Sequence, residues 1–439
     1  MAEPNFPTSA LYICDNLDLM RGMNSETIDL IATDPPFNKN VVAFRAKDGT
    51  AADGQSFTDK WSWQDDVHPE WVDAIREDWP AVEAVINAAR LAQGSDTAAY
   101  LCYMAVRLIE MRRILKPAGS LYLHCDHTAG AWLKALLDAV LGMESCRNEI
   151  VWCYTGPGSP GMRQFNRKHD TLHWYSKGTT WTFNREAVRV PYKDPAQRPR
   201  AAYDTGGAFA PEAIAAMRSR GKVPEDWWSE YAIVARQKSI AQGGERTGWA
   251  TQKPVALYER IILASSNAGD IVFDPFAGCS TTLVAAEKHG RRWVGCDIDA
   301  TAEGVVRDRL MDSRQVTNPV EDVQMLKQPP VRTDTADEPP PVLTLKPARP
   351  RERHYSRSEL LDILLARDGG VCQGCGFVPP RADYLEIDHK QPRSEGGSNA
   401  PANRVLLCSP CNRAKSDRLT LTGLRALNQR NAHVIRRIW

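Results

Sequence analysis

Four cysteines near the C-terminal end have the spacing of metal ligands. They form two Cys-x-x-Cys pairs, Cys372 with Cys375 and Cys408 with Cys411. A Cys-x-x-Cys knuckle brings two sulfurs to one ion, and two such pairs complete the tetrahedral shell of a structural Zn²⁺. A redox role is disfavoured because both pairs lie outside any alternation of strands and helices. The spacing therefore predicts one zinc site.

Residues suited to acid-base and hard-metal chemistry are interleaved with these thiols. Asp388 and His389 end an apolar stretch, Asn403 follows in a polar segment, and Asn412 comes directly after Cys411. Imidazole exchanges protons near pH 7, whereas carboxylate and amide oxygens are ligands for hard divalent cations. A histidine in an apolar strand is usually structural, but His389 begins a polar, glycine-rich loop, so we expect a chemical role for it.

This arrangement resembles an HNH endonuclease with a zinc-stabilised ββα-metal fold. The resemblance implies that His389 is the general base that activates water, and that Asp388 and Asn412 hold one Mg²⁺ on the scissile phosphate. It also implies that Asn403 braces the loop bearing His389. The family often has histidine in place of Asn412, but asparagine retains an oxygen ligand. The alternative is a zinc knuckle that grips DNA without cutting it.

A second group of residues, near the N-terminal end, is suited to acting on an amine. Asp34-Pro35-Pro36-Phe37 ends a predicted buried strand over residues 27–34. The two prolines lack backbone donors and stiffen the loop. The Asp34 carboxylate and the Pro35 carbonyl can accept hydrogen bonds from a nucleobase amine, which frees its delocalised lone pair for attack. Phe37 can stack on a base rotated out of a duplex.

Three further segments have the features of a nucleotide-cofactor site. Asp274-Pro275-Phe276-Ala277-Gly278 follows one predicted strand and opens a helix, and its glycine permits close backbone approach. Asp297 ends the next strand, where a carboxylate can bond ribose hydroxyls. Lys253 and Pro254 stand just upstream, before an apolar helix.

Together these segments resemble the S-adenosylmethionine-dependent amino-methyltransferases of DNA over about residues 10–312. The catalytic loop precedes the cofactor loop, as in the beta class, whose target-recognition region lies between them. Asp rather than Ser at position 34 favours adenine N6, and cytosine N4 is the alternative. Ser280 stands where the family more often has glycine. The resemblance implies that S-adenosyl-L-methionine is bound by Asp15, which contacts its adenine, and by Lys253, Pro254, Asp274, Phe276, Gly278 and Asp297.

Apolar patterns predict the elements that position these motifs. Buried strands are predicted at residues 27–34, 271–274 and 293–297, and a helix over residues 101–115 precedes a strand at 120–124. This alternation predicts an α/β domain with a Rossmann-like, doubly wound and mostly parallel sheet. Strands at 385–389 and 405–408 and a helix from residue 412 predict the small ββα unit.

Composition changes along the chain indicate domain limits. We expect a methyltransferase domain at residues 1–313, a proline-rich linker at 314–350, and a nuclease domain at 351–439 that is too small to fold without metal. Residues 41–98, which contain Trp61, Trp63, Trp71 and Trp79, are a candidate DNA-facing insertion. Residues 155–250, with 15 Lys and Arg against 9 Asp and Glu, are the expected target-recognition region, in which Phe165, Trp174, Tyr175, Trp181 and Tyr203 accompany the charge. The alternative to a DNA-facing role, for both segments, is that they are solvated loops and a helical flap.

Charge and cysteine usage limit the partners. Residues 331–439 have 18 Lys and Arg against 12 Asp and Glu, a charge of +6 that suits double-stranded DNA. Seven cysteines scattered singly are typical of a reducing cytoplasm, and the chain shows neither a secretory leader nor an apolar run of about 18 residues. We expect a soluble, cytoplasmic, nucleoid-associated protein with no membrane partner. Because one HNH site cuts one strand, we expect a homodimer or single-strand nicking.

The motifs are compatible with three functions. The first is a bifunctional restriction-modification enzyme that methylates DNA and cuts DNA lacking the methyl group. The second is a DNA methyltransferase whose appended domain only binds or weakly nicks DNA. The third, a zinc-dependent DNA-binding regulator on a methyltransferase scaffold, is disfavoured by the intact Asp34 and Lys253.

Overall fold

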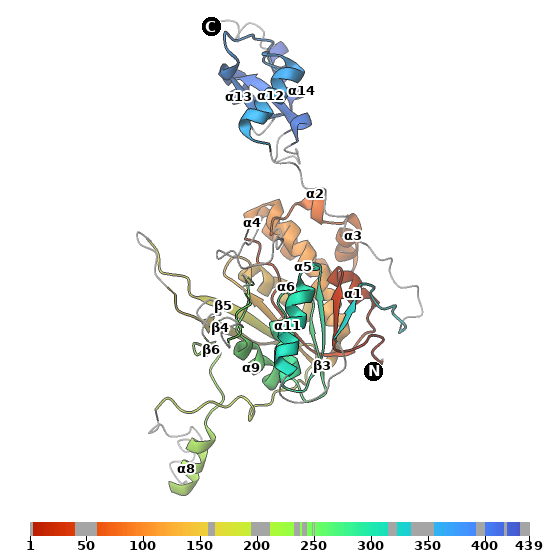
Figure 1. Cartoon of the computed structure of the whole chain (residues 1–439), viewed down its shortest axis with the longest axis vertical. Coiled ribbons are helices and arrows are strands. Elements are labelled where there is room, and N and C mark those ends of the chain that lie inside the picture. Colours follow the sequence, from red (N-terminus) through yellow and green to blue (C-terminus); the bar gives the residue numbers. More distant parts are fainter. Residues whose placement is uncertain are drawn as a thin grey trace. The chain divides into compact units, whose positions relative to one another are not determined.

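The chain folds into two compact units, Met1–Thr344 and Leu345–Trp439 (Figure 1). The boundary between them falls within the predicted linker 314–350, most of which lies outside the described residues. The prediction of a linker was wrong for the described residues 323–334, because Gln324–Leu326 pairs with Ala10–Tyr12 as an edge strand of the sheet and Thr333 bonds Asn24. The computed structural model describes residues 3–39, 59–156, 163–194, 211–231, 238, 244–247, 249, 251–314, 323–334, 355–391, 400–416 and 419–430.

A nine-stranded sheet forms the centre of the first unit, in the order β6-β4-β5-β3-β2-β7-β8-β1-β9. Neighbouring strands are parallel except where β5 pairs with β3 and β4. The predicted mostly parallel α/β sheet is confirmed. The strands are β1 (Ala10–Ile13), β2 (Ile28–Thr33), β3 (Leu115–Cys125), β4 (Cys146–Cys153), β5 (His169–Ser176), β6 (Trp227–Trp228), β7 (Ile271–Asp274), β8 (Arg292–Asp297) and β9 (Gln324–Leu326).

Two sets of helices cover this sheet. The connection from β1 to β2 and that from β7 to β8 run in opposite directions along the sheet, so right-handed crossovers place their helices on opposite faces. One set is α1 (Asn16–Gly22), α5 (Ser95–Ile114) and α6 (Gly130–Leu141), and the other is α9 (Val255–Ser265), α10 (Thr281–Lys288) and α11 (Ala302–Arg314).

The described part of the 41–98 insertion is helical and packs on α5. It contains α2 (Trp63–Asp66), α3 (Pro69–Asp78) and α4 (Pro80–Gln93). Trp71 is buried there, so it is a core residue of this flap. The 155–250 region contributes β5, β6 and the polar helix α8 (Pro211–Arg220).

The strand order brings distant motifs to one edge of the sheet. β2 lies beside β7 and β7 beside β8, with Ile31 paired to Phe273 and Asp274 to Gly295. Parallel neighbours end at the same edge, so the loops that follow these three strands leave the sheet together. The apolar residues of the strands and of α9, α10 and α11 form the core beneath that edge.

The second unit is a small hairpin covered by helices. β10 (Leu385–His389) and β11 (Arg404–Cys408) are antiparallel, and α12 (Arg357–Asp368), α13 (Ser409–Lys415) and α14 (Leu421–Arg430) accompany them. Ser356 and Glu359 form a capping box that starts α12. The buried core consists of Leu364, Cys372, Leu385, Val405, Leu406, Leu407, Cys408, Cys411, Leu421 and Leu424. Cysteines are therefore a substantial part of that core.

Candidate active sites

Asp34, in the loop after β2, has one of its two carboxylate oxygens held by Lys253 from the segment before α9. Lys253 Nζ donates a hydrogen bond to Asp34 Oδ2. Oδ1 is buried and has no hydrogen-bond partner among the described residues. Further along, the Pro36 carbonyl accepts a 2.7 Å hydrogen bond from Tyr100 Oη. One carboxylate oxygen is thus anchored, and the other remains available to accept a hydrogen bond from an amine.

Phe37, in the same loop, lies near two ammonium groups, one of this loop and one of the segment before α9. Its ring centroid is 4.9 Å from Lys39 Nζ and 5.0 Å from Lys253 Nζ. Lys39 Nζ also pairs with the buried carboxylate of Asp126 at 3.0 Å. The backbone amide of Lys39 donates a 2.7 Å hydrogen bond to the Asp59 carboxylate, which fixes the end of the loop that follows Phe37. The aromatic ring therefore has a well-defined position.

The end of β7 is bonded to the end of β2, and the loop that follows β7 has a backbone that allows close approach. Asp274 accepts hydrogen bonds from Thr33 Oγ1 at 2.7 Å and from the Phe276 amide at 3.1 Å. Gly278 has a φ of +49°, which glycine adopts at low cost. Ser280 has a φ of +61° and is buried. This left-handed backbone is a physical reason for a glycine at that position in relatives.

Asp297, at the end of β8, holds the cofactor loop from the other side. It accepts hydrogen bonds from the amides of Gly278 at 2.7 Å and Asp299 at 2.8 Å. Burial raises the pKa of both Asp274 and Asp297 to about 6, since desolvation disfavours the charged form. Ile298 is 65% exposed beside Asp297. A glycine turn, a half-buried carboxylate and an exposed apolar side chain fit a bound nucleoside.

Asp15 is engaged mainly with protein groups. It caps α1 by accepting the Leu17 amide at 2.7 Å, and it pairs with the fully buried Arg107 at 2.8 Å. Arg107 Nε donates to Asn16 Oδ1 at 2.6 Å, and Asn16 Nδ2 donates to the Pro275 carbonyl at 2.7 Å. Arg107 and Asn16 thereby link Asp15 to Pro275 in the loop after β7. A direct contact between Asp15 and the adenine of the cofactor stays a prediction.

Sequence reasoning missed a buried polar group beside Phe37. His124, near the end of β3, is fully buried, with its ring 6.0 Å from that of Phe37. Its Nε2 lies 3.2 Å from Asp170 Oδ2, and Tyr154 donates to Asp170 Oδ1 at 3.1 Å. Although burial raises the pKa of Asp170, the hydrogen bond from His124 lowers it below the ordinary value. The signal in the sequence was a histidine inside the otherwise apolar run that begins at Leu121.

Two aromatic residues of the expected recognition region belong to the core instead. Trp174 and Tyr175 are 5% and 0% exposed, because Trp174 stacks on Tyr122 in the core and Tyr175 lies against α6, where its hydroxyl donates to Asp138. Phe165 and Trp181 are exposed, and Tyr203 lies outside the described residues. The grouping of all five as DNA-facing aromatics was therefore wrong for the two in β5.

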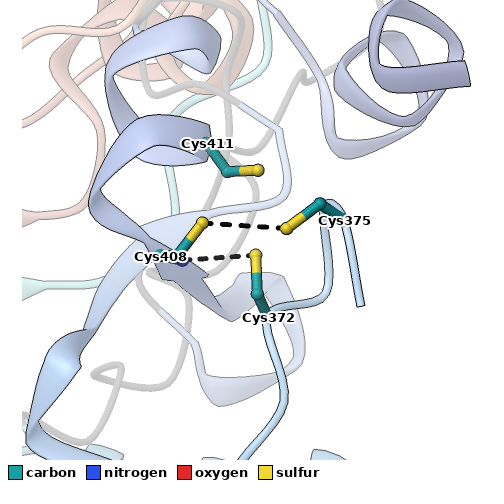
Figure 2. Close-up of side chains that lie close together, drawn as sticks. All are labelled: Cys372, Cys375, Cys408 and Cys411. Atoms are coloured by element: carbon teal, nitrogen blue, oxygen red, sulfur yellow. Dashed lines mark hydrogen bonds between the residues drawn. The ribbon is translucent and has the colours of Figure 1, made fainter. Parts of the chain in front are cut away.

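The four cysteines converge in the second unit, as Figure 2 shows. Their sulfurs lie within 4.8 Å of one another. The Cys408 amide donates to Cys372 Sγ at 3.2 Å, and Asn428 Nδ2 lies 3.4 Å from Cys411 Sγ. A Cβ at Gly374 would stand 3.1 Å from Cys411 Sγ, so only glycine fits without displacement. The four thiols and the amide donors around them fit a tetrahedral Zn²⁺.

The residues predicted to bind the catalytic metal lie where α13 packs on β10. Asn412 Nδ2 donates to a Glu386 carboxylate oxygen, and Lys415 Nζ lies 2.9 Å from Asp388 Oδ2. Glu386 and Asp388 are two residues apart on a strand, so both face the same side of it. Because the Asn412 NH₂ group is turned toward Glu386, Oδ1 is the atom left for a ligand. A divalent ion shared by Asp388 and Asn412 stays a prediction, since the Lys415 ammonium group lies beside Asp388 Oδ2.

His389 ends β10 opposite Arg404, whose Nη1 lies 3.4 Å from His389 Nδ1. The Asn403 side chain accepts the Gln391 amide at 3.0 Å and donates to the Gln391 carbonyl at 3.2 Å. The Lys390 amide donates to the Asn403 carbonyl at 2.7 Å. Through these hydrogen bonds Asn403 fixes the backbone of Lys390 and Gln391, the two residues that follow His389.

Known proteins match both units. The family model of DNA methylases (N6_N4_Mtase) matches residues 28–305, and that of HNH endonucleases matches residues 372–418. The chain is 28% identical over 301 residues to the type II methyltransferase M.HpaI of Haemophilus parainfluenzae, covering 68% of this chain and 73% of that protein. It is 27% identical over 289 residues to the DNA adenine methyltransferase YhdJ of Escherichia coli K12, with coverages of 65% and 77%.

One solved structure with a similar chain path is the PvuII DNA methyltransferase (cytosine-N4-specific). It is 15% identical, with a TM-score of 0.42, over 72% of this chain and 90% of that chain.

Among the described residues, no helix is both long and apolar enough to cross a membrane.

Proposed function

Because the chain belongs to the DNA methylase family and carries an HNH endonuclease domain, we propose that it methylates adenine N6 in double-stranded DNA and cuts DNA lacking that methyl group. One observation supports the methyl transfer above the others. Lys253, from the segment before α9, is bonded to Asp34 of the catalytic loop. Thr33, the last residue of β2 before that loop, donates a hydrogen bond to Asp274, the last residue of β7 before the other loop. The amine-binding and cofactor-binding loops therefore form one site.

Each part of this site has a separate task in the transfer. Asp34 Oδ1 and the Pro35 carbonyl accept the amine N–H groups, so the nitrogen lone pair turns toward the methyl carbon. Lys253 keeps the carboxylate oriented through Oδ2, and Pro36 keeps the loop stiff. Phe37 stacks on the flipped base. S-adenosyl-L-methionine supplies the methyl group when it is bound.

The cofactor side of the site rests on the loops after β7 and β8. Asp297 is proposed to bond the ribose hydroxyls, while Gly278 lets the backbone approach the cofactor. Asp274 holds the amide of Phe276 and so sets the shape of the loop. Pro254, the residue before α9, fixes the direction in which Lys253 enters the site.

Adenine N6 is proposed as the target because position 34 is Asp and because a relative is named as a DNA adenine methyltransferase. We assign methylation to residues 1–313, with target recognition in 155–250, and cleavage to residues 351–439. Cytosine N4 remains the alternative target. Identifying the modified base in DNA treated with the protein decides between the two.

For the nuclease we propose Asp388 and Asn412 as Mg²⁺ ligands, His389 as the general base and Asn403 as the brace of its loop. The ion, when bound, neutralises charge on the scissile phosphate. A zinc ion on the four cysteines maintains the fold of the unit. Cleavage of both strands then needs two copies of this unit, as in a homodimer, or two successive nicks.

A second candidate function is favoured by the ion pair between Lys415 and Asp388. The Lys415 side chain is buried, and its ammonium group already neutralises the proposed metal ligand. If Lys415 keeps this place, the unit grips DNA or nicks it weakly. The methyltransferase activity is the same in both cases.

One experiment separates these functions. Genomic DNA with and without prior methylation by the protein is incubated with Mg²⁺, in the presence and absence of S-adenosyl-L-methionine, and DNA ends and modified bases are sequenced. Restriction-modification predicts N6-methyladenine at one motif and ends at that motif only in unmodified DNA. Methylation without ends supports the second candidate, and absence of methylation contradicts both.

A further inference from the structure

The hairpin that joins β4 to β5 carries an aromatic side chain surrounded by water. Phe165 is 99% exposed, and Arg163, Gln164, Asn166 and Arg167 around it are exposed too. Burying an aromatic side chain is one of the larger gains a protein can make. A phenylalanine this exposed, in the chain that leads into β5, therefore points to a partner that covers it.

Strand direction places this hairpin at the edge of the sheet that carries the catalytic loop. β5 is antiparallel to both β3 and β4, so β4 runs the same way as β3 and β2. The chain leaves β4 at Cys153 and enters β5 at His169, at the edge where β2 leads to Asp34. The hairpin projects beyond the sheet there (Figure 1).

Polar contacts join the base of the hairpin to the pocket around Phe37. Tyr154 donates to Asp170 at 3.1 Å, and Asp170 lies 3.2 Å from the ring nitrogen of His124. The His124 ring is in turn 6.0 Å from the Phe37 ring. Nearer the tip, Arg167 Nη1 lies 2.8 Å from His127 Nε2, in the loop after β3. The hairpin is thus anchored to the site while Phe165 extends into solvent.

The charge of the hairpin suits a DNA duplex. Residues 163–168 have the sequence Arg-Gln-Phe-Asn-Arg-Lys, with three cations and no acid. Cations beside DNA neutralise phosphates, and apolar wedges enter the stack between bases. When a base rotates out of a duplex it leaves a gap in the stack and loses its pair. An aromatic ring can occupy that gap and stack on the neighbouring bases.

We propose that Phe165 enters the duplex at the position vacated by the target base, while Arg163, Arg167 and Lys168 hold the flanking phosphates. This inference rests on the proposed methyl transfer to a flipped base and adds the element that stabilises the opened duplex. Phe37 stacks on the base that has left, and Phe165 on the bases that remain.

The test uses the full chain and two duplexes with the motif identified by sequencing. In one the target base is paired, and in the other it faces an abasic site, where extrusion breaks no pair. Phe165→Ala should slow methylation of the paired duplex by about 10- to 100-fold, the range expected for one lost stack. On the abasic duplex the loss should shrink to about threefold or less, because the flipping cost is already reduced.

Two further variants sharpen the test. Phe165→Trp should retain activity on both duplexes, since it keeps a flat ring. Leu91→Ala removes another apolar side chain, 90% exposed on α4, and should change neither rate. Fluorescence of 2-aminopurine at the target position should rise on binding of the wild type and less with Phe165→Ala.

Equal losses with Phe165→Ala on the two duplexes would overturn the wedge, because the side chain would then contribute only to binding. An unchanged rate on the paired duplex would overturn it as well. Binding of S-adenosyl-L-methionine to the variant, measured by calorimetry, should match the wild type, and a loss would mean misfolding of the site. A wild type that methylates neither duplex would refute the proposed function itself.

Discussion

Lys253 is bonded to Asp34 although 219 residues separate them in the chain. Its backbone faces the other loop, because its carbonyl accepts a 3.2 Å hydrogen bond from Thr281 Oγ1 at the start of α10. One residue therefore has its main chain bonded to the start of α10, beside the proposed cofactor loop, and its ammonium group bonded to Asp34 of the proposed amine-binding loop. This arrangement couples the geometry of the two loops, and it adds a positioning role to the cofactor contact expected from the sequence.

Replacing Asp34 should separate catalysis from cofactor binding. Asp34→Ala removes the acceptor for the amine and should lower the rate of methyl transfer by about 100-fold or more, by analogy with the loss of one polar group that stabilises a transition state. Affinity for S-adenosyl-L-methionine should remain within a few-fold in calorimetry. Asp297→Ala should show the opposite pattern. Equal loss of cofactor affinity in both variants would contradict this division of roles.

Phe37 should contribute by stacking. Phe37→Ala should weaken transition-state binding by ~1–3 kcal/mol, the value of one base-aromatic stack, whereas Phe37→Tyr keeps the ring and should be close to wild type. The measurement is kcat/KM for methylation of a short duplex. Because Phe37 is only 9% exposed, thermal unfolding of each variant is the control. Equal kinetic effects of the two substitutions would make Phe37 a core residue only.

Asp274 should make the first unit less stable as pH rises. Its pKa is raised from 3.8 to about 6 by burial, so its contribution is fully present below about pH 4 and is lost as pH rises through 6. A rise of this size corresponds to about 3 kcal/mol. Asp274→Asn should therefore show a smaller loss of stability between pH 4 and pH 8 than the wild type.

Urea unfolding followed by tryptophan fluorescence measures this effect, because every tryptophan except Trp439 lies in the first unit. Asp73→Asn changes an exposed carboxyl on α3 and is the matched control. A pH dependence that is the same in Asp274→Asn and the wild type would show that other groups determine it.

Zinc should be required for the second unit alone. Cys408→Ser removes one of four ligands and should unfold residues 351–439 while methylation continues, because a core this small depends on its metal. Metal analysis should give one zinc per chain in the wild type. Cys146→Ser, a lone cysteine at the start of β4, should keep the zinc. A wild type without zinc refutes the site, and a folded Cys408→Ser domain would show that other contacts stabilise it.

His389→Ala should produce a methyltransferase that protects DNA. The variant lacks the proposed general base but leaves the first unit intact, so DNA that it has methylated should resist the wild-type enzyme. Gel analysis of cleavage with Mg²⁺ measures the protection, and DNA treated with Asp34→Ala is the unprotected control. Equal cleavage of protected and unprotected DNA would mean that cutting is independent of methylation.

Local spacing was sufficient to predict much of this protein. The β10–β11 hairpin lies between the two Cys-x-x-Cys pairs in the chain, and it is enough to bring their four sulfurs together, as predicted. The apolar runs that became β2, β7 and β8 were predicted because strands buried on both faces have few polar residues. For the same reason the polar loops that follow them stood out as candidate sites.

Only the tertiary structure decided which side chains meet. Asp15 with Arg107, His124 with Asp170, and Lys253 with Asp34 lie 92, 46 and 219 residues apart. Each contact depends on strand order and helix packing, which the periodicity of a single segment does not specify. The same holds for Trp174 and Tyr175. Composition marked the region as basic and aromatic, whereas packing on the two faces of the sheet, against Tyr122 and α6, buried these two rings.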